Sequence, residues 1–112
     1  MTVRDLLKTA QTEIRRGDLT PGRASELLVE LTSLLSTVLT EIREADMSYA
    51  NVLLTHLDWE EAANRARIRS QVSPEYTRMR EARDTQAVLM ELVRSLKIVL
   101  RAMTEEMRLG TR

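Results

Sequence analysis

Apolar side chains recur along most of this chain at alternating spacings of four and three residues, the heptad pattern of helices that pack against other helices. The longer of two runs lies in residues 23–73, a segment without glycine or proline. Its repeating positions are Ala24, Leu28, Leu31, Leu35, Val38, Ile42, Ala45, Tyr49, Val52, His56, Trp59, Ala63, Ala66 and Ser70. The second run follows Pro74 and comprises Met79, Ala82, Gln86, Leu89, Val93, Leu96, Leu100, Met103 and Met107. Both runs predict long helices that need a partner.

The residues that flank these runs are typical of helix boundaries. Thr2 begins a capping-box pattern, and Gly17 suits the position just after a helix. Thr20 and Ser73 are each followed by a proline, which favours a helix start at that point. The sequence therefore predicts three helices, over residues 3–16, 21–72 and 74–109.

Three such helices predict an all-α fold in a single helical domain, residues 1–112. Because the turn at Ser73 is short, the two long helices are expected to form an antiparallel, coiled-coil-like hairpin in which facing residue numbers sum to about 146. The short N-terminal helix is expected to fold back on the start of the long helix. Residues 46–51 contain poorer helix formers, and a break there would shift the register.

The apolar surface of this hairpin is broader than two helices can cover, which predicts self-association as a homo-oligomer. The alternative is that some of these side chains widen the contact within one chain. The residues expected at an oligomer interface are Leu27, Leu34, Leu39, Leu53, Leu57, Val88, Leu92 and Val99.

Composition argues against most enzyme classes. The chain has no cysteine and one histidine, His56, which falls on the apolar seam and is expected to pack there. No Glu-x-x-His motif of a ferritin-like metal bundle is present. We therefore expect neither enzyme activity nor a cofactor. The charged N-terminal residues contain no run of membrane-span length, so a cytoplasmic protein without membrane contact is expected.

One acidic cluster is a candidate metal site. In the predicted register residue 105 lies opposite Glu41, which would bring together Glu41, Glu44, Glu105 and Glu106. Oxygen ligands of this kind suit Mg²⁺ or Ca²⁺. Arginines lie close to all four in the sequence, so a solvated face of mixed charge is the favoured interpretation.

The stretch ANRARIRSQVSPEYTRMREAR, residues 63–83, holds six arginines and two glutamates in a chain of zero net charge. Arg67, Arg69 and Arg83 have no acidic residue three or four positions away, and Arg78 flanks the predicted seam beside them. In the hairpin these residues lie at its tip. We predict that Arg67, Arg69, Arg78 and Arg83, with Tyr76, bind a partner or an anion.

Three kinds of partner could supply the negative charge that these arginines would bind. They are an acidic protein, the acidic residues 18–46 of a second protomer, and nucleic acid with Tyr76 stacked on an unpaired base. A basic surface that is merely solvated remains a fourth interpretation. Zero net charge and a pI near 6.6 favour protein over nucleic acid, because dedicated DNA-binding domains are usually strongly basic.

Two stretches, EAANRARIRSQVSPEYTRMREARDT and ELVRSLKIVLRAMTEEMRL, cover most of residues 61–109 and resemble small all-helical accessory proteins of tailed bacteriophages. The resemblance implies a non-enzymatic helper in phage DNA metabolism, or a small binder of a host or phage protein, in the host cytoplasm. It implies no catalytic residues. The expected function is thus an oligomeric helical interaction protein, with a nucleic-acid-binding accessory protein of phage replication or recombination as the alternative.

Overall fold

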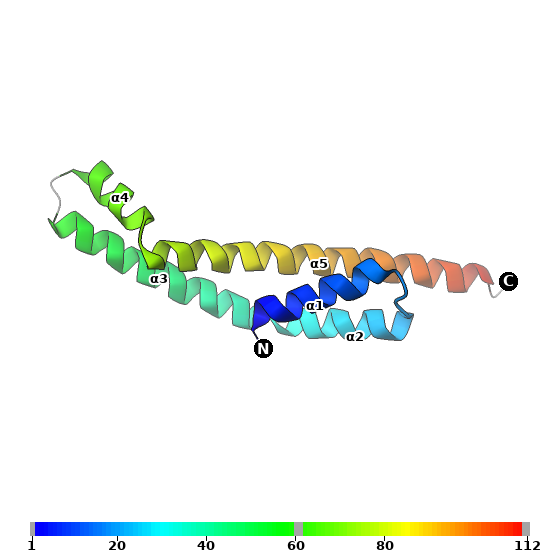
Figure 1. Ribbon diagram of the computed structural model, residues 1–112. Helices are drawn as coiled ribbons and strands as arrows, with labels where there is room; N and C mark the ends of the chain where they lie inside the picture. Colours follow the sequence, from blue (N-terminus) through cyan, green and yellow to red (C-terminus); the bar gives the residue numbers. More distant parts are fainter. Residues whose placement is uncertain (1, 60–61, 111–112) are drawn as a thin grey trace. The chain divides into compact units, whose positions relative to one another are not determined.

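The computed structural model describes residues 2–59 and 62–110, and their regular structure is entirely helical (Figure 1). The absence of strands from these residues confirms the predicted all-α fold. The helices are α1 (Val3–Arg16), α2 (Pro21–Ser33), α3 (Leu35–Trp59), α4 (Ala63–Gln71) and α5 (Pro74–Gly110).

Helix α1 begins and ends where its local sequence predicts. The Thr2 Oγ1 accepts a hydrogen bond from the Asp5 backbone N–H, and the Asp5 carboxylate accepts one from the Thr2 N–H, both at 3.2 Å. At the other end Gly17 has a φ of 73°, in the left-handed region that glycine adopts without strain. Its N–H donates to the Ile14 carbonyl, which ends the helix.

The predicted helix over residues 21–72 is wrong in its continuity. It is interrupted at Leu34, whose N–H donates to the Leu31 carbonyl in a tighter turn, and again at Ala62, which is not helical. Ala62 has extended backbone angles and no side-chain cap, and α4 starts from it. By contrast, residues 46–51 lie inside α3, so their weak helix propensity does not break the helix.

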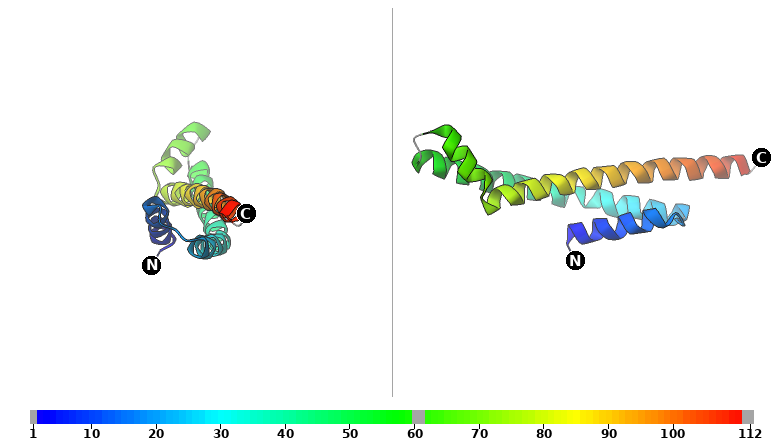
Figure 2. Two further views of the ribbon diagram at one scale, coloured as in Figure 1. Left: turned by 90° about the vertical axis from the view of Figure 1, so that its right-hand side faces the viewer. Right: turned by 45° about the horizontal axis from the view of Figure 1, so that its top comes forward.

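The chain folds into two compact units, and the first is drawn from residues 1–36 and 87–112. It contains α1, α2 and the C-terminal part of α5. Helices α1 and α2 lie side by side, joined by the turn that contains Gly17 (Figures 1 and 2). The buried apolar side chains of this unit are Leu7, Ala10, Ala24, Leu27, Leu31, Leu89, Leu92 and Leu96.

The second unit covers residues 37–86 and contains most of α3, all of α4 and the start of α5. Within it, α3 and α5 run antiparallel, and α4 lies at an angle between the end of one and the start of the other (Figure 2). The buried side chains are Val38, Ala45, Ala66, Ser70 and Ala82. Most of them are small, so this core is thin.

The connection between α3 and α5 corrects the predicted register. The prediction joined two long helices by a turn at Ser73 and placed residue 105 opposite Glu41. In the structure α4 intervenes, and Glu41 contacts Arg78 instead. The Ser73 side chain does cap α5, since its Oγ accepts the Tyr76 N–H at 3.2 Å, so the local prediction of a helix start was correct.

Candidate interaction surfaces

Arg78 of α5 lies against acidic residues of α3. Its Nε donates to Glu41 Oε1 at 2.7 Å and its Nη2 to Glu41 Oε2 at 3.0 Å, which makes a two-point ion pair. The Glu44 carboxylate and the Ser48 hydroxyl accept longer contacts of 3.5 and 3.4 Å. The hydrogen bond from Arg78 lowers the pKa of Glu41. Because both side chains are more than 40% exposed, water screens the pair, and its main effect is to fix how α5 lies on α3.

Arg83 is also paired within the chain. Its Nη2 lies 3.1 Å from Asp46 Oδ1 and 3.2 Å from Oδ2. The sequence predicted that Arg78 and Arg83 bind an external anion, and named residues 18–46 of a second protomer as one source of carboxylates. The structure supplies the carboxylates of Glu41, Glu44 and Asp46 from the same chain. Two of the four predicted anion-binding arginines are therefore already neutralised.

Tyr76 has a partner inside the chain as well. Its ring packs on that of Tyr49, with centroids 5.3 Å apart and planes tilted by 52°. The side chain is half-buried between α3 and α5. The predicted role of Tyr76 as a platform for an unpaired base would require this pair to separate.

Helix α4 presents a different surface. Its inner side carries Ala66 and Ser70, both fully buried, and the Ser70 hydroxyl donates to the Ala66 carbonyl at 2.8 Å. On the opposite side Ile68 is 64% and Val72 82% exposed. Exposed arginines flank these two side chains. We call Ile68, Val72, Arg65 and Arg67 the α4 outer face.

No carboxylate among residues 2–59 and 62–110 neutralises Arg65 or Arg67 of this face. Within the described part of the chain, Arg65 and Arg67 make no ion pair. Helix α4 itself contains no acidic residue. The predicted residue Arg69 is exposed on the same helix. Of the predicted tip, Arg67 and Arg69 thus lie on α4, while Arg78 and Arg83 lie on α5 and contact α3.

A second heptad series runs along the exposed side of α3. Met47, Ala50, Leu54 and Leu57 follow one another at spacings of three, four and three residues. Met47 is 63%, Leu54 58% and Leu57 40% exposed, and Ala50 is exposed as well. These four residues form the outer seam. The sequence prediction included Leu57 but missed Met47, Ala50 and Leu54.

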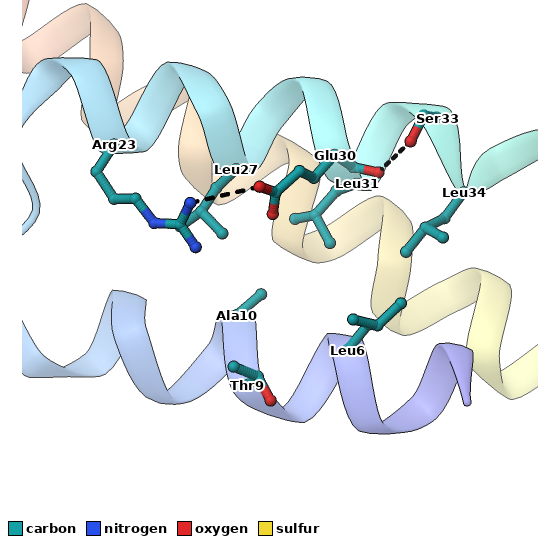
Figure 3. A pocket seen from close by; sticks show the side chains of 9 residues that line it. All are labelled: Leu6, Thr9, Ala10, Arg23, Leu27, Glu30, Leu31, Ser33 and Leu34. Carbon is teal, nitrogen blue, oxygen red and sulfur yellow. Dashed lines mark hydrogen bonds and ion pairs between the residues drawn. The ribbon is translucent and has the colours of Figure 1, made fainter. Parts of the chain in front are cut away.

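A groove lies between α1 and α2 in the first unit (Figure 3). Its volume is about 360 Å³. Its apolar lining comes from Leu6 and Ala10 of α1, from Leu27 and Leu31 of α2, and from Leu34, which caps the C-terminal end of α2. The full lining, which we call the α1–α2 groove, is Leu6, Thr9, Ala10, Arg23, Leu27, Glu30, Leu31, Ser33 and Leu34.

Arg23 sits at the edge of the α1–α2 groove among three carboxylates. Its Nε and Nη2 donate to Glu13 at 2.7 and 2.8 Å, and its Nη1 lies 3.2 Å from Glu26 and 3.4 Å from Glu30. The hydrogen bonds hold the pKa of Glu13 below its usual range and raise that of Arg23. Arg16 also acts on Glu13, so three carboxylates face two guanidinium groups and this edge of the groove carries surplus negative charge. The sequence prediction did not select Arg23, although Glu26 at i+3 could have indicated it.

The predicted oligomer-interface residues separate into three groups. Leu27 and Leu92 are buried in the core of the first unit, which corrects their predicted place at an interface. They belong instead to the wider contact within one chain that was the alternative. Leu34, Leu53 and Val99 are half-buried, and Leu39, Leu57 and Val88 are exposed.

The weak metal-site candidates are not assembled into a site. Glu41 binds Arg78, and Glu105 lies 3.9 Å from Arg108. Among residues 2–59 and 62–110, no group of three or more His, Cys, Asp or Glu side chains is placed to hold a metal ion. The prediction that Glu41 and Glu44 approach Glu105 and Glu106 assumed a direct turn from one long helix to the next. Helix α4 lies between those helices in the chain, so that register does not apply.

Comparison with known protein families, curated proteins and solved structures finds no match to this chain. None of the helices in the described part combines the length and apolar character that crossing a lipid bilayer requires.

Proposed function

We propose that this chain is a non-enzymatic helical interaction protein that associates with a second copy of itself through the outer seam of α3. The observation that carries the proposal is the exposure of Met47, Ala50, Leu54 and Leu57 at heptad spacing. Isolated exposed apolar residues are common on protein surfaces, but a heptad series on one helix is the pattern that a partner helix covers.

Charges at the two ends of the outer seam favour an antiparallel partner. Arg43 precedes Met47 by one helical turn, and Asp58 follows Leu57 directly; both are exposed. In an antiparallel pair of α3 helices, Arg43 of each copy would approach Asp58 of the other. A parallel pair would place Arg43 beside Arg43, which is unfavourable. A two-fold antiparallel dimer therefore satisfies both the apolar and the charged positions.

The alternative function, nucleic-acid binding, has less support. It was based on four arginines and Tyr76 acting together, and the structure engages Arg78, Arg83 and Tyr76 with α3 of the same chain. A role as a phage accessory factor, which the sequence resemblance implies, fits a protein that acts by binding other proteins. The outer seam and the α4 outer face are the surfaces it would use.

Light scattering coupled to size exclusion tests this proposal, at roughly 50 mM and 1 M salt. An apolar seam should hold at least a dimer, twice the chain mass of 12.9 kDa, at both salt concentrations because apolar contacts are not screened. A mass of one chain at both concentrations, over a wide range of protein concentration, would rule the outer-seam dimer out.

A further inference from the structure

We propose that the α1–α2 groove is a docking site for the α4 outer face of a second copy of this chain. The inference rests on the proposed self-association but uses none of the outer-seam residues, so either contact can fail alone. It follows from the match in shape and charge between two surfaces that belong to different compact units.

The groove offers an apolar lining with a negative edge. Leu6 of α1 and Leu34 at the end of α2 point toward one another at one end of the groove, and the buried Leu27 and Leu31 lie further along α2 (Figure 3). An apolar cavity of about 150 Å³ is enough to bind benzene, so about 360 Å³ has room for more than one aliphatic side chain. At the edge, Glu13, Glu26 and Glu30 pair with Arg23, and a second cation, Arg16, acts on Glu13 alone.

The α4 outer face offers the complementary features. Ile68 and Val72 are four residues apart, which places their side chains about 6 Å from each other on one side of the helix. Arg65 lies one turn before Ile68, and Arg67 projects on the other side. Two aliphatic side chains would enter the groove while the flanking arginines approach its carboxylates, which is a favourable arrangement for bidentate contacts.

The geometry of this contact determines how the assembly grows. The groove and the α4 outer face are different surfaces, so each docked copy still presents one free groove and one free α4. Such a contact is heterologous and produces a ring or an open chain of copies. Because exposed arginine–carboxylate contacts are screened by salt, growth beyond the dimer should occur at low salt and disappear at high salt.

A pair of charge-reversed variants tests the docking. One variant, Arg65→Glu with Arg67→Glu, reverses the α4 outer face. The other, Glu26→Arg with Glu30→Arg, reverses the groove edge and keeps the Glu13–Arg23 pair intact. Light scattering at roughly 20 mM salt should show wild-type masses about twofold or more above the dimer that rise with protein concentration. Each variant alone should stay at the dimer mass, and an equimolar mixture of the two should regain the growth.

The mixture makes the test independent of folding, because a variant that had lost its structure could not be rescued by another. A control with Arg80→Glu and Arg101→Glu makes the same charge change at two exposed arginines outside both surfaces and should grow like the wild type. Wild-type protein that stays a dimer at low salt, or a mixture that fails to grow, would overturn the docking. Failure of the outer-seam contact is distinguished by light scattering at high salt, where the protein would then have the mass of a single chain.

Nucleic acid as the ligand of α4 is one outcome of the same experiment. A labelled single-stranded oligonucleotide is added to wild type and to the Arg65→Glu, Arg67→Glu variant at low salt. Binding by the wild type alone, with no increase in protein mass before the oligonucleotide is added, would assign the α4 outer face to nucleic acid and refute docking into the groove. No binding by either protein, together with regained growth in the mixture, is the result we expect.

Discussion

Replacing Leu54 by glutamine should weaken the proposed dimer by a measurable and calculable amount. Leu54 is 58% exposed in the single chain, so that share of its apolar surface remains to be covered by a partner. Complete burial of a leucine side chain is worth about 2 kcal/mol, which gives about 1.2 kcal/mol for the exposed share. A two-fold interface contains the residue twice, so Leu54→Gln should cost about 2.3 kcal/mol. This corresponds to about a 50-fold rise in the dimer dissociation constant.

Sedimentation equilibrium at high salt measures that constant without interference from charged contacts. Glutamine is close to leucine in helix propensity, so the fold of α3 should be unaffected. Ile98→Gln is the matched control, because Ile98 is 60% exposed on α5 and lies outside the outer seam. Equal dissociation constants for the Leu54 and Ile98 variants would refute the assignment of the interface to the outer seam, even if the protein is a dimer.

Three further predictions test the fold and its ion pairs. Leu89→Ala removes a fully buried side chain from the first unit and should lower the free energy of unfolding by about 2–5 kcal/mol in urea denaturation. Ser73→Ala removes the cap that accepts the Tyr76 N–H and should cost about 0.5–2 kcal/mol, measured in the same way. Arg78 lowers the pKa of Glu41 below its ordinary 4.5, so the charged pair stabilises the fold above that pH and the effect is lost as pH falls through the lowered pKa. Wild type should therefore be more stable than Glu41→Gln near pH 7, and the difference should shrink towards zero in acid; a difference independent of pH would show that ionisation of Glu41 does not matter.

The helix boundaries that the sequence predicted correctly are those with a local cause. A capping side chain at Thr2, a glycine at Gly17 and a proline after Thr20 or Ser73 act within a few residues of the helix end. The interruption at Ala62 has no such cause, since the heptad pattern continues on both sides of it and residues 23–73 contain neither glycine nor proline. The linear pattern of apolar residues therefore does not predict it.

The errors in the predicted sites follow from that missed interruption. A continuous helix fixes one register, and that register assigns partners to every charged residue on the two facing helices. The observed register of α5 on α3 gives Arg78 a partner in Glu41 and Arg83 a partner in Asp46, where the prediction had paired Arg78 with the neighbouring Glu75 and left Arg83 without a carboxylate. Composition showed that the arginines outnumber nearby acidic residues, but only the three-dimensional register shows which of them the chain itself neutralises.

The exposed surfaces of the second unit follow from the position at which α5 begins. Tyr76 lies near the start of α5 and packs on Tyr49, so α5 extends only about two residues further along α3. Among the described residues, α4 is the helix that follows the last turns of α3, and it contributes just Ala66 and Ser70 as buried side chains. A helix of nine residues with small inward side chains leaves Leu54 and Leu57 of the outer seam in contact with water. Arg65 and Arg67 of α4 are exposed, whereas Arg78 and Arg83 of α5 pair with carboxylates of α3. One interruption in the helix thus produces an apolar surface and a basic surface in the same unit, and their opposite responses to salt are what allow the two proposed contacts to be separated by experiment.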